Sequence, residues 1–260
     1  MITRIITGLF LLGIGITLIN TGGIGFFLWV FLVTILSAYE MIMMAKKSGV
    51  QIYSSFALGV IAIAMLSVLY PPCLVIWKSF PMRLFVWGMV CFSFFELARK
   101  ILFFPKTPVF ATARIVLFVL ATFPYMFLLR EGHQGFHHFL FSVALIWSGD
   151  IAALFGGKWL GRHPLSDVSP KKTVEGSIIG FMGSMVFAGI FIRAFHFGSI
   201  YWALGALVAV VGQLGDLHES LVKRHFGVKD SSQLLPGHGG FYDRADSTLF
   251  VSPFMYFFFN

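Results

Sequence analysis

Four polar side chains stand at helical spacing at the end of a long apolar run. Asp216, Glu219, Ser220 and Lys223 follow an i, i+3, i+4, i+7 pattern, so they share one face if the helix continues past the apolar run. An ordinary amphipathic helix carries apolar residues at this spacing, whereas here the stripe is acid, acid, hydroxyl and ammonium. Hard oxygen ligands beside phosphate-binding cations favour Mg²⁺ held by one or two carboxylates and completed by substrate phosphates.

The segment that follows keeps this polar character. Lys229 and Asp230 precede a Pro-Gly-His-Gly-Gly sequence at 236–240, a tight loop in which glycines let backbone N–H groups approach an anion closely. The chain then returns to an apolar run through three charged residues, Asp243, Arg244 and Asp246. Taken singly each feature is weak, since a glycine-rich turn is usually only a turn. Their density between two apolar runs exceeds what solubility or topology requires.

A second polar constellation lies upstream, between Trp147 and Gly176. Asp150 interrupts an apolar run, and an intramembrane carboxylate is costly unless it is paired, faces water or binds a cation. The following loop supplies cations and hydroxyls suited to phosphate: Lys158, Arg162, His163, Ser169, Lys171, Lys172 and Thr173. The alternative, that these cations only hold lipid headgroups and set the topology, stays open for the lysines taken alone.

The elements that must position these residues are membrane helices. Of the 260 residues, 58% are hydrophobic and 12% are charged, and the mean hydropathy is +0.86. A soluble domain normally carries about 25% charged residues, so lipid must be the solvent for much of this chain. Alternating strands of the kind found in membrane barrels are not recognisable, which leaves helices as the spanning elements.

The apolar runs predict an all-α polytopic membrane protein with about nine transmembrane helices and a cytoplasm-facing polar cavity. The runs lie near 5–20, 24–45, 52–70, 83–104, 109–129, 138–157, 177–194, 199–217 and 248–259. The first is expected to be a retained span and not a signal peptide, since no small-residue cleavage site stands out. Residues 1–135 are expected to serve packing, assembly and dimerisation, and residues 136–260 to form the catalytic region.

Basic residues give the orientation. If every apolar run crosses the membrane once, four of the 19 Lys and Arg residues, Lys78, Arg83, Arg130 and Arg193, fall on one side and fourteen on the other, while Arg114 lies inside a run. Positive charge is enriched on the cytoplasmic side, so the loops 158–176 and 218–247 are predicted to face the cytoplasm, where nucleotides are found.

Other classes of protein are less consistent with this sequence. It has no GxxxxGK[ST] phosphate loop, HExxH zinc helix or CxxC pair, and Cys73 and Cys91 lie in or beside apolar runs. An ion-coupled transporter with Asp150, Glu40 and Glu96 along its path is an alternative, although these carboxylates are scattered in sequence. A pure membrane scaffold leaves the acidic stripe unexplained.

Residues 220–246 closely resemble the signature of the phosphatidate cytidylyltransferase (CDP-diacylglycerol synthase) family, S-x-x-K-R-x-x-x-x-K-D-x-x-x-x-x-P-x-H-G-G-x-x-D-R-x-D. Every fixed position is filled: Ser220, Lys223, Arg224, Lys229, Asp230, Pro236, His238, Gly239, Gly240, Asp243, Arg244 and Asp246. Upstream, GDLHES resembles G-D-L-x-E-S and SPKKTVEG resembles S-P-x-K-T-x-E-G. The resemblance covers the chain from Asp150 onward, and residues 1–145 match only as hydrophobic helices.

The resemblance implies transfer of CMP from CTP to phosphatidate, giving CDP-diacylglycerol and pyrophosphate, and a helical membrane fold that is often dimeric. Asp216 and Asp243 resemble the family's metal-binding carboxylates. Bound Mg²⁺, aided by Asp246 or Glu219, is the expected cofactor, and a second, monovalent cation such as K⁺ is left open. A bacterial inner membrane is the expected location, and no nucleic-acid partner is expected.

The remaining roles are hypotheses from chemistry, because bringing two anions together calls for cations more than for a base. Lys223, Arg224 and His238 join the two aspartates as expected catalytic residues. The expected substrate-binding residues are Ser169, Lys171, Lys172, Thr173, Ser220, Lys229, Asp230, Gly239, Gly240 and Arg244. A CTP-dependent lipid or polyprenol kinase, or a CDP-lipid synthase for ether lipids, is the nearest alternative.

Overall fold

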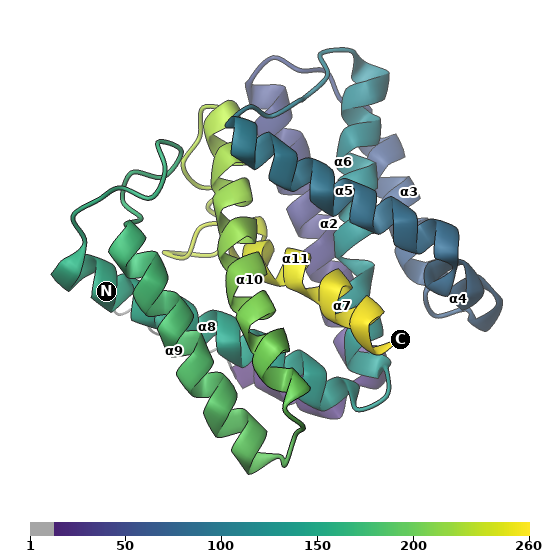
Figure 1. The fold of residues 1–260 in the computed structure, drawn as a ribbon. Coiled ribbons are helices and arrows are strands. Elements are labelled where there is room, and N and C mark those ends of the chain that lie inside the picture. Colours follow the sequence, from purple (N-terminus) through teal and green to yellow (C-terminus); the bar gives the residue numbers. More distant parts are fainter. Residues whose placement is uncertain (1–12) are drawn as a thin grey trace.

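Residues 13–260 are described by a computed structural model, and every regular element in this part of the chain is a helix (Figure 1). No β-strand occurs between residues 13 and 260, so the predicted all-α class is confirmed. The labelled helices are α2 (Gly23–Lys47), α3 (Ser54–Ser67), α4 (Pro71–Lys78), α5 (Phe80–Arg99), α6 (Pro108–Thr122), α7 (Pro124–Glu131), α8 (Gly135–Leu160), α9 (Val174–Ala194), α10 (Ile200–His225) and α11 (Tyr242–Phe259).

Six helical stretches within residues 13–260 are long and apolar enough to cross a membrane: Gly23–Lys47, Phe80–Arg99, Pro108–Glu131, Gly135–Leu160, Val174–Ala194 and Ile200–His225. A seventh span results if α3 and α4, which are bent by 104° at their junction, cross as one broken helix. The expected count of nine is therefore not confirmed. The run 5–20 lies mostly outside the described residues, and the run 248–259 belongs to α11, which contains Pro253 and is not among the six stretches.

Proline explains why several apolar runs are divided where they are. Pro71, Pro81, Pro108 and Pro124 occupy the first turns of α4, α5, α6 and α7. The fixed φ of proline suits a helix start, and its missing N–H is not needed there. The sequence 52–70 therefore ends in a bend at Pro71 and does not continue as one straight helix.

Small residues bring α8 and α9 into close contact, side by side in Figure 1. A Cβ atom added at Gly156 would lie 2.6 Å from the Ile179 side chain, and one added at Gly183 would lie 2.5 Å from Cβ of Ala152. Helices in membranes associate largely through such close packing, because lipid supplies little hydrophobic drive between them. α10 packs along α9, and α11 packs along α10.

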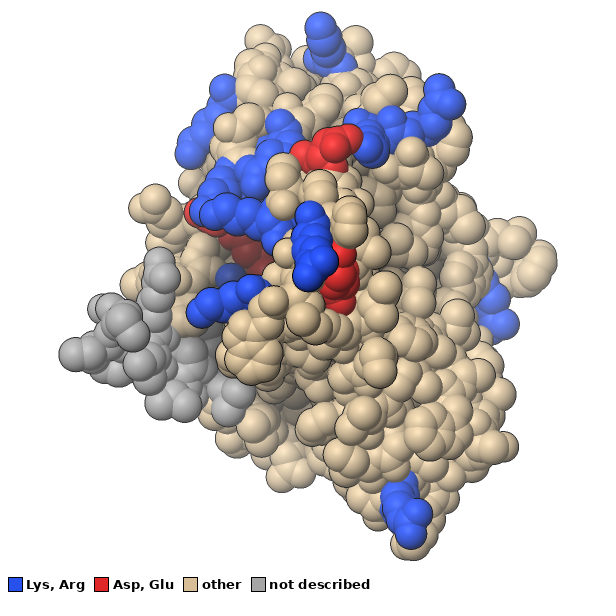
Figure 2. All heavy atoms as spheres, turned by 60° about the vertical axis from the view of Figure 1, so that its left-hand side comes forward, with Lys and Arg blue, Asp and Glu red and all other residues tan. Residues whose placement is uncertain are grey.

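The helix ends and loops that carry polar residues gather at one end of the bundle. α5 and α10 end near one another at the top of Figure 1, and the loop between α8 and α9 lies at the upper left. Lys100, just after α5, forms an ion pair with Asp167 of that loop, and the ammonium hydrogen bond lowers the pKa of the Asp167 carboxyl. Figure 2 shows Lys and Arg side chains grouped around carboxylates on the upper half of one face, above a lower half that is almost uncharged.

Candidate active site

The acidic stripe predicted from spacing lies on α10 (Ile200–His225), which continues past the apolar run as the pattern required. Glu219 and Ser220 are buried, whereas Asp216 and Lys223 are half-buried. The helix thus carries its charged residues into the bundle, next to the first turns of α11. The prediction that these four residues share a helix is confirmed.

The loop between α10 and α11 turns the chain back toward this stripe. It contains left-handed glycines, Gly227 at φ 69° and Gly237 at φ 77°, positions where a side chain would strain the backbone. Leu235 N–H donates to the Gly239 carbonyl at 2.9 Å, and His238 N–H donates to the Leu235 carbonyl at 2.8 Å. The Pro-Gly-His-Gly-Gly sequence is therefore the tight loop that the glycines indicated.

Three carboxylates converge where α10 faces α11. One oxygen from each of Asp216, Glu219 and Asp246 lies within 4.8 Å of the others. Oε1 of Glu219 is buried and accepts no hydrogen bond from the described residues. Such a group of hard oxygen donors, one of them unsatisfied, fits a divalent cation such as Mg²⁺.

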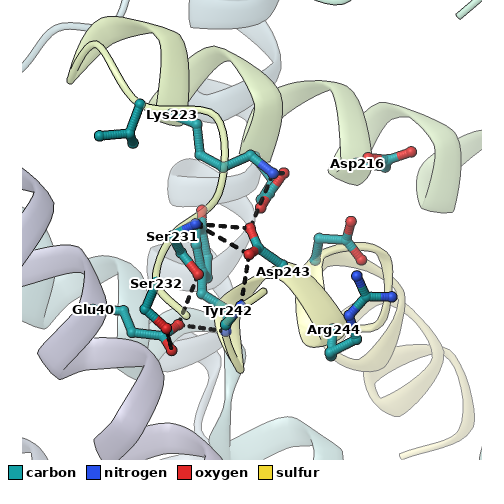
Figure 3. A network of polar contacts seen from close by, with 12 residues as sticks. Glu40, Asp216, Lys223, Ser231, Ser232, Tyr242, Asp243 and Arg244 are labelled. Carbon is teal, nitrogen blue, oxygen red and sulfur yellow. Dashed lines mark hydrogen bonds and ion pairs between the residues drawn. The ribbon is translucent and has the colours of Figure 1, made fainter. Parts of the chain in front are cut away.

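Lys223 joins this acidic group to Asp243, as Figure 3 shows. Its Nζ lies 2.7 Å from Oε2 of Glu219 and donates to Oδ1 of Asp243 at 3.0 Å. Oδ2 of Asp243 also accepts from the backbone N–H groups of Gly240 at 2.8 Å and Ser231 at 3.1 Å. The Asp243 carboxylate is thus next to the three converging carboxylates but is not one of them, and its expected metal role stays a prediction.

The loop between α8 (Gly135–Leu160) and α9 (Val174–Ala194) reaches the same site through Lys172. Nζ of Lys172 lies 2.5 Å from Oδ2 of Asp216, with both side chains about one-third exposed. The neighbouring Thr173 caps α9, its hydroxyl accepting from Gly176 N–H at 3.1 Å. The two polar segments recognised in the sequence therefore meet at Asp216, one from the α8–α9 loop and the other from α10.

A cavity of about 570 Å³ lies beside these residues. Its polar wall consists of Asp150, Asp216, Glu219, Lys223, Asp230, His238, Asp243, Arg244 and Asp246. Its apolar wall comes mainly from α2, α7 and α8, with Trp29, Val33, Met126, Phe139 and Trp147 among its residues. A chamber with a charged wall and an apolar wall can hold an amphiphilic substrate whose headgroup is anionic.

Other residues of the predicted site lie away from this cavity wall in the described part of the chain. Arg224 is exposed and donates from Nη1 to the Val228 carbonyl at 2.9 Å. Lys171 and Lys229 are exposed, Ser169 is half-buried in the α8–α9 loop, and Ser220 is buried on α10. Their substrate-binding roles stay predictions.

Gly239 and Gly240 lie beside carboxylates of the site, and neither position has room for a side chain. A Cβ atom added at Gly239, which has φ 80°, would lie 2.5 Å from Oδ2 of Asp243. One added at Gly240 would overlap Oγ of Ser231 and lie 2.5 Å from the Glu40 carboxylate. Both glycines thus admit a carboxylate against the backbone, and their predicted role beside the triphosphate stays a prediction.

Sequence reasoning missed a role for Glu40 at the site. This carboxylate on α2 (Gly23–Lys47) is buried and accepts hydrogen bonds from Ser231, Ser232, Phe241 and Tyr242 (Figure 3). The available signal was an acidic residue inside an apolar run, the same signal that Asp150 gives. Nothing local to residue 40 indicated which distant segment it would contact.

Glu96 on α5 (Phe80–Arg99) anchors a separate buried network. It accepts from Arg114 at 2.5 Å and from Phe103 N–H at 2.9 Å, and its Oε2 lies 3.3 Å from Nε2 of His218. Glu96 and Glu40 do not line the cavity that Asp150 lines within residues 13–260. An ion path through all three carboxylates, as the transporter alternative requires, is not favoured by this arrangement.

Comparison with known proteins identifies the family of this chain. The chain matches the profile of the cytidylyltransferase family over residues 2–260. It belongs to that family. A phosphatidate cytidylyltransferase from Staphylococcus haemolyticus is 30% identical over 259 residues, which cover 97% of this chain and 96% of that protein.

Two further relatives match mainly through part of the chain. A phosphatidate cytidylyltransferase from Synechocystis sp. is 51% identical over 124 residues, 46% of this chain and 42% of that protein. One from Bacillus subtilis is 46% identical over 140 residues, 52% of each chain. These two alignments span about half the length of the relatives, whereas membership of the cytidylyltransferase family extends over the whole chain.

Proposed function

We propose that this cytidylyltransferase-family protein is a membrane-embedded phosphatidate cytidylyltransferase, which transfers CMP from CTP to phosphatidate. The observation that carries the proposal is the meeting of Asp216, Glu219 and Asp246 beside Lys172 and Lys223 in a cavity with one apolar wall. The names of the full-length and partial relatives support the same choice of substrates.

In the proposed reaction a phosphate oxygen of phosphatidate attacks the α-phosphorus of CTP. The new P–O bond forms as the bond between the α-phosphorus and its bridging oxygen to the β-phosphate breaks, and pyrophosphate leaves. The attacking phosphate is already an anion, so the site needs no strong base. Its task is to bring two anions together and to stabilise charge on the departing pyrophosphate.

We propose that Asp216, Glu219 and Asp246 hold a magnesium ion, and that Asp243 contributes once Lys223 turns toward substrate. These carboxylates would hold the ion, whose positive charge would offset the negative charge of the CTP phosphates. A monovalent cation beside it is compatible with four carboxylates at one site, and binding measurements in K⁺ and Na⁺ buffers test this.

In this proposal the cationic side chains of the site bind the phosphate groups of both substrates. Lys172 and Lys223 each already contact a carboxylate of the site, at 2.5 Å and 2.7 Å, so either can exchange that partner for a phosphate by a side-chain rotation. Arg244 and His238, on the same cavity wall, are placed to contact phosphates, with Nδ1 of His238 buried and lacking a partner among the described residues. The apolar wall then receives the acyl chains of phosphatidate.

We further propose that the protein is a homodimer in a bacterial inner membrane and that the cavity opens to the cytoplasm. The positive-inside bias supports this orientation, since it puts fourteen of the 19 basic residues on the side of the two polar loops. Light scattering of the detergent-solubilised protein measures the dimer directly.

The activity is tested with purified protein, phosphatidate, Mg²⁺ and CTP labelled on either the α- or the γ-phosphate. A cytidylyltransferase moves the α-label into lipid and releases the γ-label as pyrophosphate. A CTP-dependent lipid kinase does the reverse and leaves CDP, so γ-label in lipid would refute the proposal. Offering ether-linked phosphatidate in a parallel assay distinguishes the lipid classes.

The ligand assignment has its own test. Asp216→Asn and Asp246→Asn are expected to abolish Mg²⁺-dependent turnover while the protein stays folded in detergent, because each removes a charged ligand. Asp167→Asn, an exposed acid on the α8–α9 loop, is the matched control. Near-normal turnover with the usual Mg²⁺ dependence in either site variant would exclude the assignment.

A further inference from the structure

We infer that Glu40 is a positioning residue of the active site: it fixes the loop and the first turn of α11 that carry Asp243 and Asp246. Glu40 belongs to α2, far in sequence from the polar signature at residues 220–246. It is 1% exposed and is not among the residues that line the cavity within 13–260, so it acts through others and not on the reacting atoms.

All four hydrogen bonds that Glu40 accepts from the described residues come from one segment, residues 231–242. Oε1 accepts from the Ser232 hydroxyl at 2.6 Å and from Phe241 N–H at 3.0 Å. Oε2 accepts from the Ser231 hydroxyl at 2.9 Å and from Tyr242 N–H at 2.9 Å. The donors lie 191 to 202 residues away in sequence, so α2 holds both ends of this loop.

Two of these bonds cap α11 (Tyr242–Phe259). Phe241 is its N-cap and Tyr242 its first residue, and no side chain of the cap itself bonds the free N–H groups. The first N–H groups of a helix need partners from outside, and a negative charge there is favoured by the helix dipole. Glu40 supplies both, from a helix distant in sequence.

The same backbone groups connect Glu40 to Asp243. Ser231 donates its hydroxyl to Glu40 and its N–H to Asp243, while consecutive N–H groups of Gly240 and Phe241 donate to Asp243 and to Glu40. Gly240 is packed between the two, since a Cβ there would lie 2.5 Å from the Glu40 carboxylate. A shift of Glu40 would therefore displace the backbone N–H groups that donate to the Asp243 carboxylate.

The chemistry of a buried carboxylate argues against an incidental contact. An ionised group inside a protein is costly unless it is paired or fully hydrogen-bonded. Glu40 forms no ion pair with residues 13–260, so the four donors of the loop are what satisfies it there. The loop supplies the hydrogen bonds that the Glu40 carboxylate needs, and the carboxylate in turn holds the loop in place.

Glu40→Gln is the sharpest variant. The amide keeps one acceptor oxygen and replaces the other with an NH₂ group, toward which a serine hydroxyl can turn but a backbone N–H cannot. One of the α11 capping bonds is therefore lost without a change of size. Hydrogen exchange of peptides within 231–246, measured without substrates, is expected to quicken about tenfold.

Thr34→Val is the matched control. Thr34 is also buried on α2, but its hydroxyl donates to the Val30 carbonyl of its own helix at 2.7 Å and forms no hydrogen bond with the loop in the described part of the chain. This variant should leave exchange of 231–246 at the wild-type rate. If Glu40→Gln does not accumulate in the membrane, Ser231→Ala removes one donor, and a rise in exchange confined to the same peptides is expected.

The kinetic arm of the test rests on the proposed function, whereas the exchange arm does not. In Glu40→Gln the Mg²⁺ concentration for half-maximal activity should rise about tenfold, as expected when a supporting contact around a metal site is lost. Exchange in 231–246 equal to wild type, or a rise spread evenly over the chain, would overturn the inference. Absence of any CDP-lipid from the wild-type protein would instead overturn the proposed function and leave the exchange result standing.

Discussion

Lys223 is the side chain through which Glu219 and Asp243 share one positive charge. Its Nζ is 2.7 Å from the first and 3.0 Å from the second, and all three side chains are largely buried. A buried cation between two acids does little for net stability, but its removal leaves charge without compensation. The residue therefore links the stability of the bundle to the geometry of the candidate site.

Lys223→Met tests this link. The variant is expected to lose activity and about 3 kcal/mol of stability, because two buried carboxylates lose their counter-charge. Thermal unfolding in detergent measures the loss, with Lys47→Met, at an exposed position, as the control. Adding Glu219→Gln to Lys223→Met should recover part of the stability and none of the activity; equal stability of Lys223→Met and the wild type would contradict the account.

Gly240 offers a second prediction at the residue scale. Gly240→Ala forces a methyl group toward Ser231 and Glu40 and moves the backbone that holds Asp243. A displacement of this kind costs about 100-fold in turnover when catalytic groups shift by an ångström. Gly59→Ala on α3, where nothing lies within 4 Å of the added atom, should keep wild-type turnover in the same CMP-transfer assay.

The contact between α8 and α9 matters to the site although it lies apart from the carboxylates. These helices approach through glycines, and their connecting loop delivers Lys172 to Asp216. Any change that separates the helices also withdraws that lysine. Packing between these helices and the position of Lys172 beside Asp216 are therefore coupled through this pair.

Gly183→Leu is the corresponding test at the element scale. The larger side chain would collide with Ala152, and over-packing of this kind destabilises by about 1–3 kcal/mol. We expect a lower thermal midpoint and a higher KM for CTP, since Lys172 moves away from the site. Gly88→Leu on α5, where the space beside the glycine is open, is the control, and a similar effect of both variants would show that the α8–α9 contact is not special.

The whole molecule separates a charged end from an apolar body. Figure 2 shows Lys and Arg side chains grouped around carboxylates on one half of a face, and the ion pair between Lys172 and Asp216 joins the two polar segments. A soluble anionic nucleotide and a membrane lipid can meet only at such a boundary. CTP can reach this end under the proposed function only if it faces the cytoplasm, and that orientation is a property of the whole chain.

Cysteine labelling measures that orientation. In a background with Cys73 and Cys91 replaced by serine, cysteine is introduced at one exposed loop position, Arg162, Gln233 or Ser199. Arg162→Cys and Gln233→Cys should react with a membrane-impermeant maleimide only in inverted vesicles, and Ser199→Cys only in right-side-out cells or spheroplasts. Labelling of Arg162→Cys and Gln233→Cys from opposite sides would disprove the shared face.

The sequence by itself determined that this is a helical membrane protein and predicted which two segments carry the candidate site. Hydropathy, the i, i+3, i+4, i+7 stripe on α10 and the glycine-rich loop are local properties. The structure shows the helices, the shared helix and the tight loop that they predicted. The expected nine spans were not confirmed. The run 5–20 lies mostly outside the described residues, the run 52–70 forms only the 14-residue helix α3 before the bend into α4, and α11 carries Asp243, Arg244 and Asp246 in its first turns.

Only the tertiary structure decided which carboxylates meet. It gathered Asp216, Glu219 and Asp246, put Asp243 against Lys223, and brought Glu40 from α2 to the start of α11. The physical reason is that these contacts depend on how helices cross and face one another. Residues separated by nearly two hundred positions leave no periodic trace of such a contact in a single sequence.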